Sequence, residues 1–161
     1  MHNSIGHYVY RVTTSASLHT QVCFALHSAS RATTAAYRTL LEALGLTYPQ
    51  YLVMLALWEQ DERGVSDLCT ALDLDTGTLS PLLKRLETHG LLERRRQQAD
   101  ERRVTICLTE AGRALHVKAR DIPGRLADAT GMSATELDEL RSTLDRLRHA
   151  LGSVDATDRH G

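Results

Sequence analysis

Apolar residues recur at helical spacing along most of the chain, and strand-like alternation is confined to one stretch. The longest helical pattern starts near Leu18 and continues through alanine-rich sequence to Leu44, where Gly45 ends it. A helix over this stretch has about 27 residues and a length of about 40 Å, which is long for a small domain. We therefore expect this helix to cross a partner subunit.

A second pattern, between residues 65 and 108, predicts two short helices followed by a β-hairpin. Ser66 caps the first helix, which ends near Leu72, and Asp75 caps the second. Pro81 fits plain helix poorly, and we expect a bent first turn there. The apolar positions of the second helix follow the i, i+3, i+4, i+7 spacing of a half-buried helix: Leu79, Leu82, Leu83 and Leu86.

The strands of the hairpin are expected at residues 91–95 and 103–108. The second strand places alternate apolar residues toward the core, namely Val104, Ile106 and Leu108. Cys107 therefore faces away from the core. Two short helices with such a hairpin form a winged helix-turn-helix. The predicted fold class is mainly α with a small β-wing, and with dimerisation helices at the N- and C-terminal ends.

The last helix combines a capping box with a repeated leucine pattern. Ser133 and Glu136 have the spacing of the capping box. The leucines alternate spacings of three and four, as in a coiled-coil seam: Leu137, Leu140, Leu144, Leu147 and Leu151. Either the long first helix covers this seam, or the two helices together build a dimer interface. We expect the second arrangement.

These patterns divide the chain into four kinds of segment. Residues 1–17 are polar and aperiodic, which predicts a flexible N-terminal arm. Residues 18–63 and 109–152 form a helical dimerisation region, and residues 64–108 form the winged helix-turn-helix. Residues 153–161 are polar and are expected to be a disordered tail.

Positive charge is concentrated at the tip of the hairpin. The chain has a net charge of −1, but residues 94–103 contain five arginines against Asp100 and Glu101, a local charge of +3. Arginines at a wing tip can reach phosphates and a narrow minor groove, while small hydroxyl groups at the start of a helix suit the major groove. The residues that we assign to a double-stranded DNA interface are Asp75, Thr76, Thr78, Ser80, Lys84, Arg85, Arg94, Arg95, Arg96, Asp100, Arg102 and Arg103.

The composition and residue spacing argue against several other classes of protein. The longest apolar run, residues 51–58, is eight residues, whereas a membrane-spanning helix needs about 20. Three cysteines without a CxxC motif argue against a disulfide framework or a zinc finger. No catalytic triad or acid and base pair has a recognisable spacing. We expect a cytoplasmic protein that is not an enzyme, with no membrane segment, metal or cofactor.

Two segments resemble a known family. DTGTLSPLLKRLETHGLLERRR and DERRVTICLTEAGRAL are similar to the recognition helix and wing of the MarR family of bacterial transcription factors. YPQYLVMLALWE and VCFALHSASRATTAAYRTLLEALGLTYPQY resemble its branch of organic hydroperoxide resistance regulators (OhrR), and the likeness covers roughly residues 22–151. This resemblance implies a homodimeric repressor on a pseudo-palindromic operator, with Arg102 entering the minor groove.

The resemblance also implies a redox sensor. In OhrR-type repressors the cysteine that matches Cys23 senses organic hydroperoxides, and the matches to Tyr37 and Tyr48 hold it by hydrogen bonds. Most free cysteines are small buried hydrophobes, but Cys23 lies within the first two turns of the predicted helix, and a helix N-terminus favours thiolate. His27 lies one turn along on the same face and stands where the family often has a tyrosine, which puts the peroxide sensitivity in question.

Helix geometry adds a constraint on this site. Fourteen residues of helix separate Cys23 from Tyr37, about 21 Å along the axis, so they cannot touch within one chain unless the helix breaks. If they form a pair, Tyr37 comes from the other subunit of a dimer. Some relatives carry a second, resolving cysteine near Asp128, where this chain has RLADATG. The chain therefore resembles the one-cysteine type, in which a small external thiol can form a mixed disulfide with Cys23.

Three alternatives stand beside a repressor that is switched by oxidation of Cys23. One is a MarR-type repressor that a small lipophilic or phenolic ligand releases, with Cys23 structural. Another is a thiol peroxidase that uses the same cysteine, which the helix-turn-helix disfavours. The third is a metal sensor, but Cys23 and His27 supply only two ligands at i, i+4 spacing.

Overall fold

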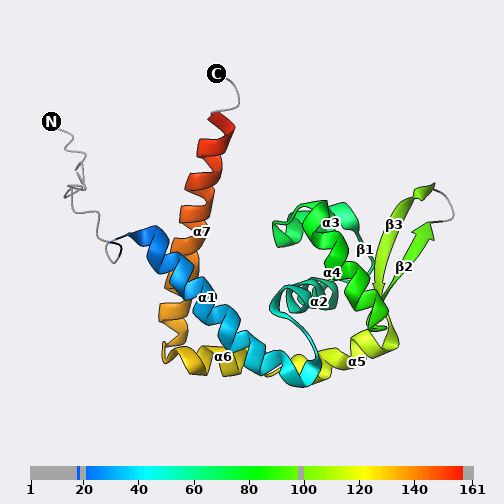
Figure 1. Ribbon diagram of the computed structural model, residues 1–161, viewed down its shortest axis with the longest axis horizontal. Helices are drawn as coiled ribbons and strands as arrows, with labels where there is room; N and C mark the ends of the chain where they lie inside the picture. Colours follow the sequence, from blue (N-terminus) through cyan, green and yellow to red (C-terminus); the bar gives the residue numbers. More distant parts are fainter. Residues whose placement is uncertain (1–17, 19–20, 98–99, 158–161) are drawn as a thin grey trace. The chain divides into compact units, whose positions relative to one another are not determined.

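The computed structural model describes residues 18, 21–97 and 100–157 (Figure 1). It confirms a mainly α fold with a small β-wing. The chain forms two compact units, which divide after Ala35, and each is described by itself. In chain order the elements are α1 (Val22–Leu41), the 3-10 helix η2 (Glu42–Leu44), α2 (Tyr48–Glu59), β1 (Arg63–Gly64), α3 (Val65–Leu72), α4 (Thr76–Thr88), β2 (Leu92–Gln97), β3 (Asp100–Leu108), α5 (Glu110–Ala119), α6 (Ile122–Thr130) and α7 (Ala134–Thr157).

The first helix is shorter than the sequence predicts. α1 has 20 residues, which corresponds to about 30 Å. Its C-terminal end tightens into the 3-10 turn η2, a common way for a helix to end. Gly45 then adopts a φ of 64° and ends the turn, as predicted.

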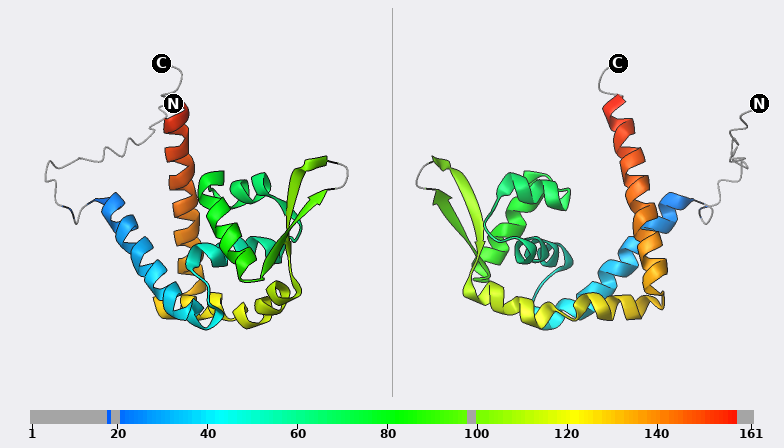
Figure 2. Two further views of the ribbon diagram at one scale, coloured as in Figure 1. Left: turned by 45° about the vertical axis from the view of Figure 1, so that its right-hand side comes forward. Right: turned by 180° about the vertical axis from the view of Figure 1, so that it is seen from behind.

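The wing is a three-stranded antiparallel sheet in the order β1-β3-β2. β2 and β3 pair from Leu92 opposite Leu108 to Gln97 opposite Asp100, with an irregularity after Arg96, so both strands are longer than predicted. Figure 2 shows this hairpin from two sides. β1 was not predicted, because a two-residue strand has too few positions to show alternation.

The hydrophobic core lies in the second unit and is centred on α2. Met54 and Leu57 are fully buried, and the leucines of α4 that the sequence assigns to its inner face include three at 0% exposure: Leu79, Leu83 and Leu86. The start of α5 is pressed against the turn before β2, where a Cβ atom at Gly112 would collide with the carbonyl oxygen of Leu91. Glycine is therefore required at this contact.

In the winged helix-turn-helix, residues 64–108 (the winged unit), one detail corrects a prediction and another adds to one. α3 begins two residues earlier than a Ser66 cap requires, because Gly64 is the N-cap residue and Asp67 reaches back to accept its N–H at 3.3 Å. Cys107 lies outside the hydrophobic core cluster, in agreement with its predicted orientation, but it is buried, with 1% of its surface exposed. β3 is the central strand of the sheet, and the carboxylate of Asp61, near β1, accepts the N–H of its last residue, Leu108.

The C-terminal helix begins as predicted and continues further. Ser133 and Glu136 form the capping box, with the Ser133 N–H donating to the Glu136 carboxylate at 2.8 Å. α7 runs to Thr157, so the tail predicted from residue 153 is helical as far as that residue. The predicted N-terminal arm and residues 158–161 lie outside the described residues.

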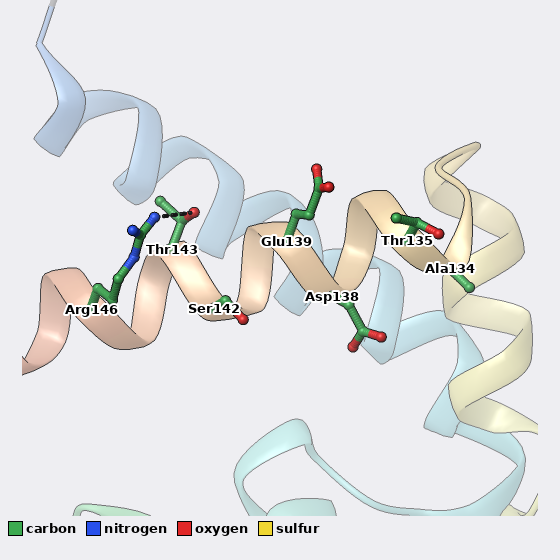
Figure 3. Close-up of a pocket in the computed structure, with 7 residues that line it drawn as sticks. All are labelled: Ala134, Thr135, Asp138, Glu139, Ser142, Thr143 and Arg146. Atoms are coloured by element: carbon green, nitrogen blue, oxygen red, sulfur yellow. Dashed lines mark hydrogen bonds between the residues drawn. The ribbon is translucent and has the colours of Figure 1, made fainter.

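The leucine pattern of α7 remains uncovered in a single chain. Leu140, Leu144 and Leu151 are 44%, 39% and 59% exposed, and no residue between 134 and 152 is buried. An open, polar groove follows another face of the same helix, where Arg146 donates to the Thr143 hydroxyl at 3.2 Å (Figure 3). The apolar stripe and the polar groove make α7 an amphipathic helix.

Among the described residues, no single helix is long and apolar enough to cross a membrane. By length and composition alone, one bent pair of helices passes the same test, residues 22–44 together with Tyr48–Glu59. Buried core helices also pass it, and much of α2 is buried.

Candidate DNA interface and sensor residues

The candidate recognition helix is α4, and its N-terminus is fixed by its own cap. Asp75 accepts the N–H of Thr78 at 2.7 Å, as the sequence predicts for a capping residue. α4 passes through Pro81 without ending. The inner leucines anchor one face in the core, so the opposite face is held outward.

The structure places most of the predicted recognition residues on the exposed surface of α4. Thr76, Thr78, Lys84 and Arg85 are exposed, as is the capping Asp75, whereas Ser80 is half-buried. A shallow open pocket joins this helix to the base of the wing, and it is lined by Gly77, Ser80, Pro81, Lys84, Glu87 and Arg94. Residues of α4 and β2 therefore line one pocket, and the two elements lie side by side (Figure 1).

Two wing arginines are already paired with carboxylates of the same chain. Arg94 lies 3.3 Å from Glu87 on α4. Arg95 lies 2.6 Å from Glu93 and 3.4 Å from Glu62, and its hydrogen bond to Glu93 raises its pKa. DNA phosphates would have to compete with these carboxylates for the two guanidinium groups.

Of the remaining predicted wing residues, the structure describes only one side chain. Arg96 is exposed at the end of β2. Asp100, Arg102 and Arg103 belong to β3 by backbone, but their side chains lie outside the described residues. Their predicted roles at the wing tip stay predictions.

Sequence reasoning missed the carboxylates that hold the wing. Glu93 and Arg95 are two positions apart on one strand and so share a face, a signal that alternation offers. Glu62 has no such signal, because it lies 33 residues from Arg95 in sequence and has a φ of 60° in the turn before β1.

Asp61 connects the wing to α5 and was also missed. Its carboxylate accepts the N–H of Leu108 at 2.8 Å and the N–H of Glu62 at 2.8 Å, and it accepts a guanidinium hydrogen of Arg113 at 2.8 Å. Burial alone would raise the pKa of Asp61, but these three hydrogen bonds lower it on balance. The side chain fixes the junction between the sheet and the helix that follows it.

The predicted redox sensor lies in the first unit. Cys23 is the second residue of α1, and its side chain is exposed, as is that of His27 in the next turn. The other two cysteines differ. Cys69 is half-buried on α3, with its sulfur 3.8 Å from the Thr76 hydroxyl, and burial raises the pKa of the Cys107 thiol.

The two tyrosines assigned to the sensor lie together in the second unit. The rings of Tyr37 and Tyr48 stack with centroids 4.3 Å apart and planes inclined by 22°. Burial, together with the neighbouring Tyr48 and Tyr51, raises the pKa of Tyr37 to about 12, and burial also raises the pKa of Tyr48. Both phenols therefore keep their hydrogen at neutral pH and remain able to donate a hydrogen bond.

The tyrosine pair continues into a larger aromatic group that sequence spacing did not show. Tyr51 lies 5.7 Å from Tyr37 and 6.1 Å from Trp58, between ring centroids. Trp58 stacks on His116 at 4.9 Å and donates its indole N–H to the Gly112 carbonyl at 2.9 Å.

Within the described residues, no group of three or more His, Cys, Asp or Glu could hold a metal ion.

Comparison with protein families and curated proteins finds transcriptional regulators. The family model described as transcriptional regulator SarA/Rot matches residues 35–118. The organic hydroperoxide resistance transcriptional regulator of Bacillus subtilis (strain 168) is 46% identical over 134 residues, covering 83% of this chain and 91% of that protein. The HTH-type transcriptional regulator TtmR of Methylorubrum extorquens (strain PA1) is 46% identical over 143 residues, covering 86% and 73% respectively.

A solved structure shows the same fold on DNA. Reduced AbfR bound to DNA is 34% identical, with a TM-score of 0.73, and the match covers 85% of this chain and 94% of that chain. AbfR is a protein of Staphylococcus epidermidis. Further structures describe it in an overoxidized form bound to DNA and in a disulfide form.

Proposed function

Because the chain belongs to the MarR family of winged-helix, DNA-binding transcriptional regulators, and within it to the organic hydroperoxide resistance regulators, we propose that it is a homodimeric repressor that leaves its operator when Cys23 is oxidised. The observation that carries the proposal is the exposed Cys23 at the start of α1, in a chain 46% identical to an organic hydroperoxide resistance regulator. The relatives are regulators and not enzymes.

The DNA part of the proposal is supported by the surface of α4 and the wing. In winged helix-turn-helix proteins the second helix enters the major groove, and residues in its first turns reach base edges. The exposed Thr76 and Thr78 occupy those turns, and Lys84 and Arg85 follow where phosphates pass. AbfR, with the same fold, is bound to DNA in its reduced form.

The dimer is supported by the uncovered leucine stripe of α7. A row of leucines at coiled-coil spacing is stable only when another helix covers it, and Leu140 and Leu144 are far more exposed than core leucines. A two-fold dimer presents two recognition helices about one turn of DNA apart, which fits a pseudo-palindromic operator.

The sensing reaction needs only the thiolate and the oxidant. The Cys23 thiolate attacks the distal oxygen of an organic hydroperoxide, so an S–O bond forms and the O–O bond breaks. The alkoxide leaves with the electron pair and takes a proton to become the alcohol, and Cys23 becomes a sulfenic acid. A small external thiol then condenses with it, giving a mixed disulfide and water.

Accessibility selects Cys23 among the three cysteines. Reactive cysteines are exposed and rich in thiolate, and Cys23 is the most exposed of the three. Cys107 is buried with a raised pKa. In the dimer, Tyr37 and Tyr48 of the partner subunit would donate hydrogen bonds to Cys23, and a bulkier oxidised sulfur would break these bonds.

The experiment that tests the proposal measures intact mass and operator binding on one sample, before and after organic hydroperoxide. We expect a mass increase on Cys23 together with loss of binding. Cys23→Ser should bind the operator normally and ignore hydroperoxide, while Cys69→Ser and Cys107→Ser should still respond. A Cys23→Ser dimer that still leaves its operator on oxidation would overturn the proposal.

A second candidate is release by a small phenolic or lipophilic ligand, with Cys23 structural. The aromatic group of Tyr37, Tyr51 and Trp58, in tilted and edge-to-face contact, favours it, because flat rings pack well against such ligands. Loss of binding by an unmodified protein in the presence of a reversible ligand would support this candidate over oxidation.

A further inference from the structure

The first turn of α4 holds a threonine whose hydroxyl hydrogen is already committed. Asp75 accepts the Thr78 N–H with Oδ1 at 2.7 Å and the Thr78 hydroxyl with Oδ2 at 2.8 Å. The hydrogen bonds from Thr78 lower the pKa of Asp75, so this group is a carboxylate at neutral pH. A carboxylate accepts hydrogen bonds and cannot donate them.

The direction of this hydrogen bond limits what Thr78 can offer to DNA. A hydroxyl has one hydrogen and two lone pairs, and here the hydrogen points to Asp75. The exposed side of Thr78 therefore presents lone pairs. On the major-groove edges of the bases, adenine and cytosine present amino hydrogens, whereas guanine and thymine present acceptor atoms without an amino group.

We propose that Thr78 determines operator specificity by accepting a hydrogen bond from an amino-bearing base, adenine or cytosine, and that Asp75 sets this preference by holding the hydroxyl hydrogen. The inference rests on the proposed function, because it requires α4 to lie in the major groove. It assigns to Asp75 a positioning role in addition to its role as a helix cap.

Replacing Asp75 by asparagine should reverse the preference. Asparagine is also a good N-cap residue, so the helix start is retained. The amide oxygen of the Asp75→Asn side chain can accept the Thr78 N–H, and its NH₂ group can donate to the Thr78 oxygen. The Thr78 hydroxyl hydrogen is then free to point outward, which favours guanine or thymine at the same position.

Three variants serve as controls. Thr78→Val removes the hydroxyl and keeps the branched shape, whereas Thr78→Ser keeps the hydroxyl. Thr88→Val is matched to Thr78→Val, because Thr88 lies at the other end of α4 and its hydroxyl donates to the Lys84 carbonyl at 2.9 Å. Circular dichroism and affinity for unrelated duplex DNA check that each variant folds.

The experiment selects binding sites from a randomised duplex pool with the full-length protein and each variant. We expect one position in each half-site at which the parent, Thr78→Ser and Thr88→Val prefer adenine or cytosine. Thr78→Val should lose the preference there alone, and Asp75→Asn should shift it to guanine or thymine. Removing the amino group from that base should weaken binding by the parent about 2- to 10-fold and leave Thr78→Val unaffected.

The outcomes separate this inference from the proposed function. A parent that selects an operator while Thr78→Val selects the same sequence at every position overturns the inference and leaves the proposed function standing. Equal affinity of the parent for operators with and without the amino group overturns the inference without relying on any variant. A parent that selects no sequence overturns the proposed function, and the inference with it.

Discussion

The leucines of α4 and those of α7 follow similar helical spacings, but three of those on α4 are buried and three of those on α7 are exposed. On α4, Leu79, Leu83 and Leu86 are 0% exposed, whereas Leu140 and Leu144 on α7 remain 44% and 39% exposed. The winged unit therefore completes its core within one chain, and α7 leaves its apolar stripe for another surface. The recognition helix thus belongs to a complete core, whereas α7 carries an apolar stripe that we propose a second subunit covers.

A matched pair of leucine substitutions gives the largest expected effect. Leu83→Ala leaves a cavity in a complete core and should lower the free energy of unfolding by about 2 to 5 kcal/mol at any protein concentration. Leu144→Ala should act through the dimer, so its effect on the melting temperature should depend on protein concentration. Denaturation at two concentrations more than tenfold apart measures both effects.

Two results would contradict the assignment of the α7 leucine stripe to a dimer interface. If Leu144→Ala destabilises the protein equally at all concentrations, while sedimentation shows an unchanged dimer, the stripe is covered within its own chain. The distinction between the two regions would then be wrong. A monomer that binds operator specifically would lead to the same conclusion.

Within the winged unit, the tip and the base of the wing should differ. Arg102, which resembles the family arginine of the minor groove, should contribute about 1 to 3 kcal/mol to operator binding. Arg102→Ala should weaken binding and reduce the dependence of affinity on salt by about one counterion. Binding titrations between low and moderate salt measure this, and unchanged affinity at moderate salt would remove the wing from the interface.

Much of the fold could be predicted because its signals are local. The caps at Asp75 and Ser133, the inner leucines of α4 and the hairpin are specified by residues within a few positions of each other. Contacts between distant residues could not be predicted in this way. Asp61 bonds to Leu108, 47 positions away, and no local pattern indicates that partner.

In the candidate site, too, local features could be predicted from the sequence and contacts between distant residues could not. The position of Cys23 within the first two turns of a helix and the exposed polar residues of α4 were predicted from local sequence. The pairing of Arg95 with Glu62 and the aromatic group that extends to Trp58 and His116 depend on how the chain folds back. The burial of Cys107 was not predicted, because strand alternation alone does not show what covers the second face of a strand.

A smaller effect is expected at the junction between the wing and α5. The pKa of Asp61 is lowered in the folded protein, so its contribution to stability is complete above its ordinary value of 3.8 and is lost as the pH falls through the lower folded value. Asp61→Asn should lower stability by about 1 kcal/mol at neutral pH, since its side chain is only 27% exposed. The difference between parent and variant should shrink below about pH 4, and chemical denaturation across this range measures it. A constant difference down to pH 2 would show that the charge of Asp61 is not the cause.

The smallest expected effect is at Arg95, and it sharpens the contrast between the base and the tip of the wing. Arg95 is 55% exposed and already paired with Glu93 and Glu62, so Arg95→Ala should change stability by less than about 1 kcal/mol. Because DNA must displace these carboxylates, the same change should weaken operator binding less than Arg102→Ala and leave the salt dependence nearly unchanged. Glu93→Gln frees the guanidinium from its nearer partner and should tighten binding and steepen the salt dependence. If Arg95→Ala instead matches Arg102→Ala in both affinity and salt dependence, the base of the wing contacts phosphate as directly as its tip.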